Sequence, residues 1–544
     1  MKPGRFTAPP AACVALVVLT AATAALFAPT LTYPWLAWDD GINVARNPGL
    51  NPVTWDGLAG FWLRPYEQLY IPVSYSFFAA ETVASRLLSG RSADQPLSPV
   101  LFHACSIALH AIAGLLVWRL LGRIGLDDRA ARLCAAALFL CHPLQVEAVA
   151  WISDQRGLLA AVFSLAALDV GLGTGGGAAR QGSWRTALAL GCFGLATLSK
   201  PQAVSVPLLL FLLDGRTWRE PVSRTALRAL PWALAVVVVL AVTAVAQPAD
   251  GVAARAPIWL RPIVAGDALF HYALSLVVPL RLAIDYGRIP DVVLADPWSY
   301  GRAAVGVAGL VAVAGAPGLD RWRLPLALAI VPLLPVLGFL PFAFQGISTV
   351  ADRYAYLAMV GPALAFGRLA SRSARVGRWG LVVAVTCLAA CCVMTHRQVQ
   401  TWSSSAAVFS RAIEVNPRSF VARLGLAGEM LRAERYAEAI VHFDAAIAVD
   451  SQSRDLPKAY YGRALALHRS QNLQAAGRDY VRALNFDRGN ADLRNDYGIL
   501  LAQQGMAAEA AEQFEAAVRL RPEFTEAAQN LRAARAILAE PPAK

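Results

Sequence analysis

Long apolar runs are the feature that most constrains how this chain can fold. A helix needs about twenty apolar residues to cross a bilayer, and runs near that length recur up to residue 395. Only 16% of the 544 residues are charged, whereas about a quarter are charged in a typical soluble domain. We therefore predict an all-α, polytopic membrane helical bundle. Its spans, about eleven, are expected at residues 11–31, 99–121, 132–150, 157–173, 187–199, 201–213, 230–247, 302–318, 324–342, 354–371 and 379–395.

Basic residues give the predicted orientation of these spans. The net charge is +12, but the arginines gather in alternate loops between apolar runs, so topology accounts for the charge and no nucleic-acid partner is expected. Lys2 and Arg5 precede a first run that is longer than the apolar core of a usual signal peptide, which predicts an uncleaved span and a cytoplasmic N-terminus. The arginines placed inside are Arg119, Arg123, Arg129, Arg132, Arg180, Arg185, Arg216, Arg219, Arg224, Arg228, Arg321, Arg323, Arg368, Arg372, Arg375 and Arg378.

Residues 263–281 are a special case among the apolar stretches. If they crossed the membrane once, every later loop would change sides. We therefore predict that Phe270–Pro279 forms a re-entrant or interfacial helix, or two half-passages. The loop that follows, with Asp285 and Tyr286, then stays outside.

The cysteines give little sign of chemistry. All eight lie in apolar segments. None has zinc-ligand spacing with histidine, and no disulfide framework is visible. We predict small core residues and no metal site.

An internal repeat fills the polar, alanine-rich end of the chain. The pattern alanine, aromatic, alanine recurs with spacing 0, 4, 7 in three copies that lie 37 and 34 residues apart. The second offset is the tetratricopeptide period, in which small residues let paired helices approach each other. We predict an extracytoplasmic α-solenoid at residues 399–544, after a membrane domain at residues 1–398. The repeat positions are Ala439, Phe443, Ala446, Ala476, Tyr480, Ala483, Ala510, Phe514 and Ala517.

The ends of the repeat array are also readable. Phe409, Ala412 and Pro417 match the second half of an earlier copy. The longer offset implies a three-residue insertion near Ser451–Ser453. Residues 524–538 are predicted to form a capping helix.

Two adjacent acids, Asp39 and Asp40, follow the first predicted span. Charge beside a membrane is costly unless it is solvated or paired, so this pair is a candidate functional site. If the carboxylates are close, the like charge raises the pKa of one of them and suits it to act as a base. The alternative is a flanking loop whose acids face water.

Other polar groups fall in loops that the topology places on the same outer face. His142 and Glu147 end the third run, and Lys200 lies at a turn between two short runs. Asp352 and Arg353 precede the tenth, and an arginine there can hold a phosphate by charge-assisted hydrogen bonds. A lone histidine at such a position is more often a capping or packing residue than a ligand, and a lone arginine is usually an interface anchor.

These motifs follow one another in a specific order. The acidic pair precedes His103 and His110, then His-Pro-Leu-Gln-Val-Glu-Ala-Val-Ala-Trp, Ser-Lys-Pro, Ala-Asp-Arg-Tyr-Ala-Tyr-Leu and the repeats. Over nearly its whole length the chain resembles a bacterial member of the transmembrane and tetratricopeptide-repeat O-mannosyltransferases. The resemblance implies a GT-C-like architecture in the inner (cytoplasmic) membrane and a polyprenyl-phosphate sugar donor. Residues 70–74, Tyr-Ile-Pro-Val-Ser, depart from the His-Pro-Leu-Thr-like sequence of the family, which bears on acceptor specificity.

The resemblance also implies roles for individual residues. The catalytic acid of the first external loop falls on Asp39 or Asp40, which would take the proton of the acceptor hydroxyl. Lys200 and Arg353 would stabilise the departing lipid phosphate. A metal bridging the two acids is disfavoured, because neighbouring residues rarely chelate one ion well. The substrate pocket is expected to include His142, Glu147, Asp352, Asp285 and Tyr286.

Three hypotheses follow for the function. The first is an inverting glycosyltransferase that moves a mannose-like sugar from polyprenyl phosphate to protein Ser/Thr hydroxyls, with the repeats docking the acceptor or a partner. The second is a non-catalytic, membrane-anchored repeat scaffold for envelope assembly. The third keeps the chemistry but has a glycan or lipid acceptor. A transporter fits less well, because the polar residues gather at one face and not at mid-bilayer.

Overall fold

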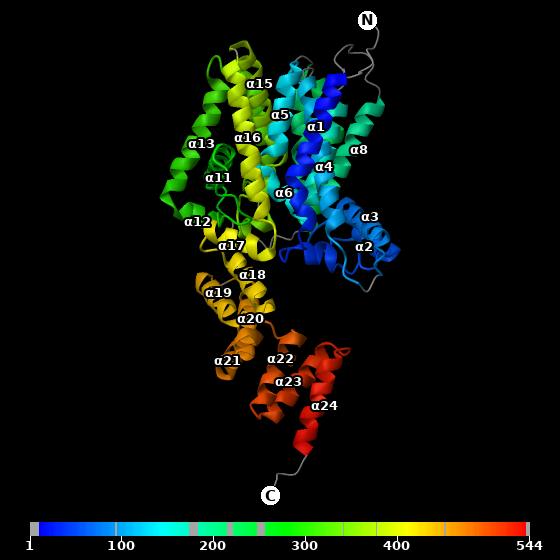
Figure 1. Ribbon diagram of the computed structural model, residues 1–544, viewed down its shortest axis with the longest axis vertical. Coiled ribbons are helices and arrows are strands. Elements are labelled where there is room, and N and C mark those ends of the chain that lie inside the picture. The colour runs from blue at the N-terminus through cyan, green and yellow to red at the C-terminus, as the bar shows by residue number, and fades with distance from the viewer. Residues whose placement is uncertain are drawn as a thin grey trace. The chain divides into compact units, whose positions relative to one another are not determined.

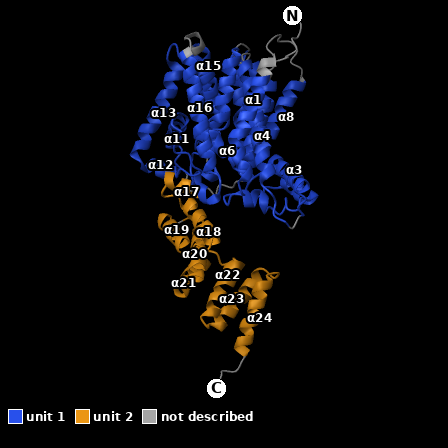
Figure 2. Ribbon diagram, in the orientation of Figure 1, with its two compact units in different colours: residues 1–408 blue, residues 409–544 orange. Residues whose placement is uncertain are grey.

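A computed structural model describes residues 10–92, 95–172, 183–214, 221–246, 256–340, 342–376, 378–450 and 453–539 (Figure 1). These residues form helices, with two isolated bridges in place of any strand. The all-α prediction is confirmed. The chain divides into two compact units, residues 1–408 and residues 409–544 (Figure 2). Arg180, Arg216, Arg219 and most of the insertion predicted near Ser451–Ser453 lie outside the described residues.

Unit 1 is a helical bundle in which α7 packs on α4 and α8, and α15 packs on α5. Its helices are α1 (Pro10–Phe27), α2 (Trp55–Leu63), α3 (Pro72–Ser89), α4 (Val100–Arg123), α5 (Arg129–Cys141), α6 (Val146–Ala150), α7 (Gln155–Gly171), α8 (Ser183–Ser199), α9 (Val206–Leu213), α10 (Val222–Ala246), α11 (Arg261–Val277), α12 (Pro290–Ala295), α13 (Pro297–Gly315), α14 (Asp320–Ile330), α15 (Val360–Val376) and α16 (Arg378–Gln400). Short 3-10 or π segments join them: η1 (Ala28–Thr32), η2 (Gly41–Ala45), η3 (Pro143–Gln145), η4 (Ile152–Asp154), η5 (Pro201–Ser205), η7 (Val331–Val336), η8 (Ala343–Gly346), η9 (Asp352–Tyr354) and η10 (Leu357–Met359).

The prediction of about eleven spans is wrong. Within the described residues, four helical segments are long and apolar enough to cross a membrane: Val14–Thr32, Val100–Arg123, Val222–Ala246 and Trp379–Gln400. The number rises to five if Arg129–Cys141 and Pro143–Ala150, which are bent by 52° relative to each other, count as one span.

Helix breaks explain much of this difference. In the predicted span 324–342, α14 stops at Ile330 and the chain continues as a 3-10 segment that contains Pro332 and Pro335. In the predicted span 354–371, the α-helix begins only at Val360. Proline lacks a backbone donor and its ring clashes with the preceding turn, so it divides an apolar run into shorter pieces. Hydropathy counts such a run as one span because it does not register where a helix ends.

The stretch 263–281 lies mainly in α11, which is one unbroken helix to Val277, so two half-passages are wrong. Asp267 of α11 is buried and accepts hydrogen bonds from Arg288 Nε at 2.9 Å and Arg302 Nε at 2.7 Å. These ion pairs join α11 to α13 and to the loop between them.

The cysteines do not all behave as core residues. Cys141 is buried, but Cys387 is exposed on α16. The prediction of a core position is therefore wrong for Cys387, which lies on the outer side of an apolar helix.

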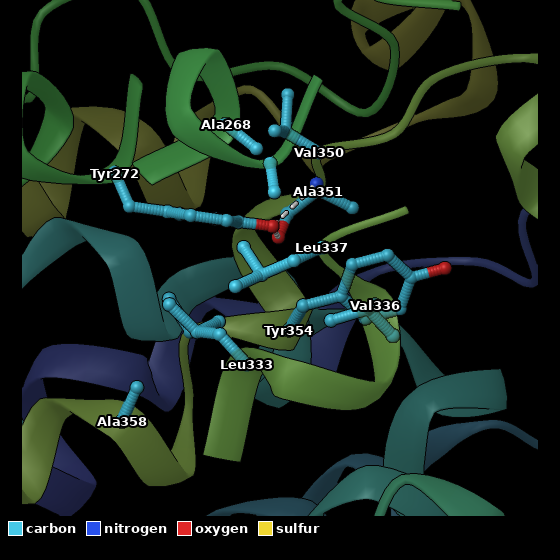
Figure 3. Close-up of a cluster of buried hydrophobic side chains, with 11 residues drawn as sticks. Ala268, Tyr272, Leu333, Val336, Leu337, Val350, Ala351, Tyr354 and Ala358 are labelled. Atoms are coloured by element: carbon cyan, nitrogen blue, oxygen red, sulfur yellow. Dashed lines mark hydrogen bonds between the residues drawn. The ribbon is translucent and has the colours of Figure 1, made fainter. Parts of the chain in front are cut away.

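A hydrophobic cluster sits beside the segment that carries Asp352 and Arg353. Tyr272 of α11 reaches into it, and its hydroxyl donates to Ala351 O at 3.3 Å and accepts from Ala351 N at 3.2 Å (Figure 3). Leu333 and Val350 complete the packing around this contact. The backbone just before Arg353 is therefore held in place by a buried side chain.

The repeat prediction is confirmed in unit 2, an α-solenoid of paired helices. The first and second alanines and the aromatic residue of each predicted copy are buried, as in Ala439, Phe443 and Ala446. A Cβ added at Gly462 would lie 2.3 Å from Cζ of Phe443, so a small residue is needed where the helices meet. The helices are α17 (Ser405–Val415), which begins in unit 1, α18 (Phe420–Arg432), α19 (Tyr436–Val449), α20 (Leu456–Arg469), α21 (Leu473–Phe486), α22 (Ala491–Gln503), α23 (Ala507–Leu520) and α24 (Thr525–Ala539).

Candidate functional site

Asp40 ties two distant loops of unit 1 together. Its carboxylate accepts hydrogen bonds from Leu36 N at 3.0 Å, Ser153 N at 2.9 Å and Ser153 Oγ at 2.6 Å. The residue is 1% exposed. Burial raises the pKa of Asp40 to about 6, although the Ser153 hydrogen bonds oppose the shift. Asp40 is therefore occupied in joining the loop after α1 to the segment between α6 and α7.

Asp39 is in a different environment from its neighbour. Its side chain is 40% exposed, and its Oδ2 lies 4.0 Å from Arg156 Nη2. The protein surrounds the carboxylate on its other sides, and this desolvation raises the pKa of Asp39 while Arg156 and Arg353 lower it. Asp39 is thus the acid of the pair that a substrate can reach.

A row of alternating charges runs inward from Asp39. This charge row consists of Asp39, Arg156, Asp154 and Lys200. Arg156 Nε lies 3.8 Å from Asp154 Oδ1, and the same oxygen accepts a hydrogen bond from Lys200 Nζ at 2.7 Å. Asp154 is fully buried, and burial lowers the pKa of Lys200 although Asp154 opposes the shift. Buried charges persist when each has a partner of opposite sign. The row therefore keeps two cations, Arg156 and Lys200, in fixed positions next to the Asp39–Asp40 pair.

Glu147 and Arg353 form a second buried pair next to this row. The Arg353 guanidinium donates to Glu147 Oε1, and Arg353 N donates to Glu147 Oε2 at 3.2 Å. The guanidinium carbon lies 4.1 Å from the centre of the Phe344 ring and 5.3 Å from that of Trp151. The break at Pro143 ends α5 and starts the turn that places Glu147 here.

A narrow cleft with a cavity volume of about 30 Å³ opens beside these cations. One wall is a face of α7 made of small residues, and the opposite wall is aromatic and apolar. Lys200 and Arg353 both reach the cleft, and Lys200 Nζ lies 5.7 Å from the centre of the Tyr354 ring. The lining residues are Gly157, Ala160, Ala161, Ser164, Lys200, Gln202, Ala203, Ser205, Pro332, Arg353, Tyr354, Tyr356 and Leu357.

The structure thus brings Asp39, Lys200, Glu147 and Arg353 together, although they lie far apart in the chain. His142 is placed differently. Its ring binds Leu276 O through Nε2 at 3.0 Å and accepts from Leu144 N at 3.2 Å, so it braces the backbone and does not line the cleft.

The remaining predicted pocket residues lie behind Arg353. The Tyr286 hydroxyl donates to Asp352 Oδ1 at 2.7 Å and accepts from Ala283 N at 3.1 Å. Asp285 accepts from Gly287 N at 2.7 Å, which closes a tight turn. None of these three side chains lines the cleft. They support the loop after α11 and the start of η9.

Asp154 and Arg156 are the site residues that sequence reasoning missed. They lie just after the His-Pro motif, where Asp154 precedes the apolar helix α7 and Arg156 is its second residue. That placement was the available signal, because charges at the end of a buried helix need partners. No group of three or more His, Cys, Asp or Glu side chains in the described parts of the chain is placed to hold a metal ion.

Unit 2 carries a groove of its own. The groove has a volume of about 310 Å³. Its lining joins the first two helix pairs and combines apolar, basic and acidic side chains: Leu431, Arg432, Glu434, Tyr436, Leu465 and Arg469. Such a surface can take an extended peptide between paired helices.

No family model matches this chain, and no curated protein matches it. Solved structures to which part of the chain is similar include MamA, with 20% identity, a TM-score of 0.24 and coverage of 26% of this chain and 81% of MamA. They also include YrrB, described as a TPR protein with an unusual peptide-binding site, with 23% identity, a TM-score of 0.23 and coverage of 25% of this chain and 68% of YrrB. The chain is a tetratricopeptide-repeat helical protein.

Proposed function

We propose that unit 1 is an inverting glycosyltransferase that moves a mannose-like sugar from a polyprenyl phosphate to Ser/Thr hydroxyls of a protein. The observation that carries the proposal is the accessible carboxylate of Asp39 at the end of a buried charge row that leads to Lys200 and the cleft. The proposal places the protein in a bacterial inner membrane, with Asp39 and the repeats on the extracytoplasmic side. Support for a membrane location comes from the apolar helix α10, of which only 11% is buried.

The proposed chemistry is a single displacement. Asp39 takes the proton of the acceptor hydroxyl as its oxygen attacks the anomeric carbon. The bond between that carbon and the phosphate oxygen breaks, and polyprenyl phosphate leaves with the electron pair. The anomeric centre is inverted, and no metal is needed for proton removal.

Lys200 and Arg353 suit the leaving group. Both are cations that line the cleft, and such cations can hold a phosphate by charge-assisted hydrogen bonds. Because the phosphate leaves as an anion, fixed positive charge lowers the barrier without proton donation. Glu147 and Asp154 keep the two cations in place before the donor binds.

The first prediction tests the proposed base directly. In vesicles containing polyprenyl-phosphate mannose and a Ser/Thr-rich peptide, the wild-type chain should mannosylate the peptide, and Asp39→Asn should lower kcat by about 100-fold or more, because general-base catalysis is lost. Asp56→Asn is the matched control, since Asp56 is exposed in the first turn of α2. Full activity of Asp39→Asn would remove the residue from the mechanism.

A non-catalytic scaffold is the second candidate, and the groove of unit 2 favours it. In that case the apolar helices anchor repeats that bind an envelope protein, and the charge row only stabilises unit 1. The two candidates separate in one assay. A scaffold should transfer no sugar to peptide, glycan or lipid, yet should still capture its protein partner when Asp39 is replaced by asparagine.

A further inference from the structure

We infer that Ser405 and Trp402, at the junction between α16 and the repeats, are positioning residues for the proposed transfer reaction. The inference rests on the proposed function, but its evidence is separate from the charge row. Both residues belong to unit 1. Both lie more than 360 residues after the acid that they would help to place.

Ser405 holds the loop that carries Asp39. Its hydroxyl accepts a hydrogen bond from Ala37 N at 2.9 Å, and Ser405 is 8% exposed. The preceding amide, Leu36 N, is bound by Asp40 at 3.0 Å. Two successive amides before Asp39 are therefore fixed by side chains, which limits where the acid can go.

Trp402 acts on the cationic side of the site. It is 2% exposed, and its ring stacks on Trp151 with 6.4 Å between ring centres and an angle of 27°. Trp151 in turn lies against both arginines, 5.3 Å from Arg353 and 5.8 Å from Arg156. A stacked aromatic pair keeps that surface rigid, because displacement of one ring would open a void beside the guanidinium groups.

The junction is itself well anchored in unit 1. Thr395 of α16 is buried and donates to Cys141 O at 2.6 Å. The chain then passes Trp402 and Ser405 and continues into α17, which ends at Val415. A segment that leads into the repeats thus contacts the loop that carries the acid, through Ala37, and the tryptophan that lies against both arginines.

Ser404 provides a matched control for Ser405. Its hydroxyl accepts from Ala407 N at 3.2 Å and so caps α17. The experiment compares Ser405→Ala, Ser405→Thr, Trp402→Ala and Ser404→Ala in the full chain. It measures kcat and KM for polyprenyl-phosphate mannose and for a Ser/Thr-rich peptide.

Ser405→Ala should lower kcat about 5- to 10-fold and leave the KM of the donor within about twofold, since loss of one fixed contact misplaces the base without removing donor contacts. Ser405→Thr keeps the hydroxyl and should restore the rate. Trp402→Ala should lower kcat further. Ser404→Ala should retain the wild-type rate.

Hydrogen exchange gives a readout that does not depend on catalysis. Ser405→Ala should speed exchange in the segment around Ala37, and Ser404→Ala should not. If the wild-type chain transfers sugar and both Ser405→Ala and Trp402→Ala keep its kcat, the positioning role is overturned. The proposed function is then unaffected. No transfer by the wild-type chain overturns the proposed function itself.

Discussion

Asp39 and Asp40 are adjacent in the chain but have opposite surroundings. The carboxylate of Asp40 accepts three hydrogen bonds and is excluded from solvent, whereas that of Asp39 faces an opening with Arg156 4.0 Å away. A base must reach the proton that it removes, so the proposed reaction uses the more accessible acid, Asp39. Asp40 contributes by fixing the backbone on which Asp39 sits.

The second prediction concerns Asp40 and pH. Burial raises the pKa of its carboxyl from 3.8 to about 6, so the folded chain binds more protons than the unfolded chain between these values. The free energy of unfolding should therefore fall, by on the order of 2–3 kcal/mol, as the pH rises from about 4 to about 6, and stay level above that range. Thermal unfolding in detergent at a series of pH values measures this change in stability.

Asp40→Asn is the variant that checks this assignment. The amide cannot ionise, so the fall in stability between these pH values should shrink relative to wild type. An unchanged pH profile would assign the slope to other groups.

At the scale of elements, the start of α7 joins the charge row to the cleft. Asp154 and Arg156 flank its first residue, and Gly157 begins the face of small side chains. A Cβ at Gly157 would lie 2.4 Å from Asp154 Oδ2 and 3.0 Å from Lys200 Nζ. A methyl group at this position would therefore have to displace the ion pair beside it.

The third prediction follows from that distance. Gly157→Ala should push Asp154 and Lys200 apart and lower the stability of the chain by about 1–3 kcal/mol. It should also weaken donor binding, seen as a higher KM for polyprenyl-phosphate mannose. Gly191→Ala in α8 is the control, because an added Cβ there meets no atom within 4 Å. Equal behaviour of the two variants would contradict the steric argument.

At the scale of the whole molecule, the two units have separate cores. The cluster around Tyr272 belongs to unit 1, and the cluster around Tyr480 belongs to unit 2. The acid, the cations and the cleft all lie in unit 1, while the peptide-sized groove lies in unit 2. The proposed chemistry and the proposed acceptor docking are therefore carried by different parts of the chain.

The fourth prediction uses this division. A chain that ends at Asn416 keeps Ser405 and Trp402 and should transfer mannose to a short peptide at about the wild-type rate. Its KM for a long acceptor protein should rise about 10-fold or more, because the second binding site that raised the local acceptor concentration is gone. Kinetics with both acceptors measure the difference. Equal KM values for the long acceptor would remove the repeats from acceptor binding.

The sequence by itself determined the repeats and the helical class. A period of 34 residues restricts the fold to stacked helix pairs, because alanine and aromatic residues at fixed spacing must pack in the same way in every copy. It also indicated the residues Asp39, Lys200, Glu147 and Arg353 as one site. It did not determine the number of long apolar helices, since hydropathy does not register where Pro332 or Pro143 ends a helix.

Only the tertiary structure decided which acid is accessible and what surrounds it. The bonds from Ser153 to Asp40 and from Ala37 to Ser405 join residues more than a hundred positions apart. Neither local spacing nor residue type encodes such a pairing, because it depends on how the loops at the ends of α1, α6 and α16 meet. The packing of these loops determines how buried each side chain is and which partners it binds. For this reason Asp40 anchors the backbone, whereas the carboxylate of Asp39 stays accessible.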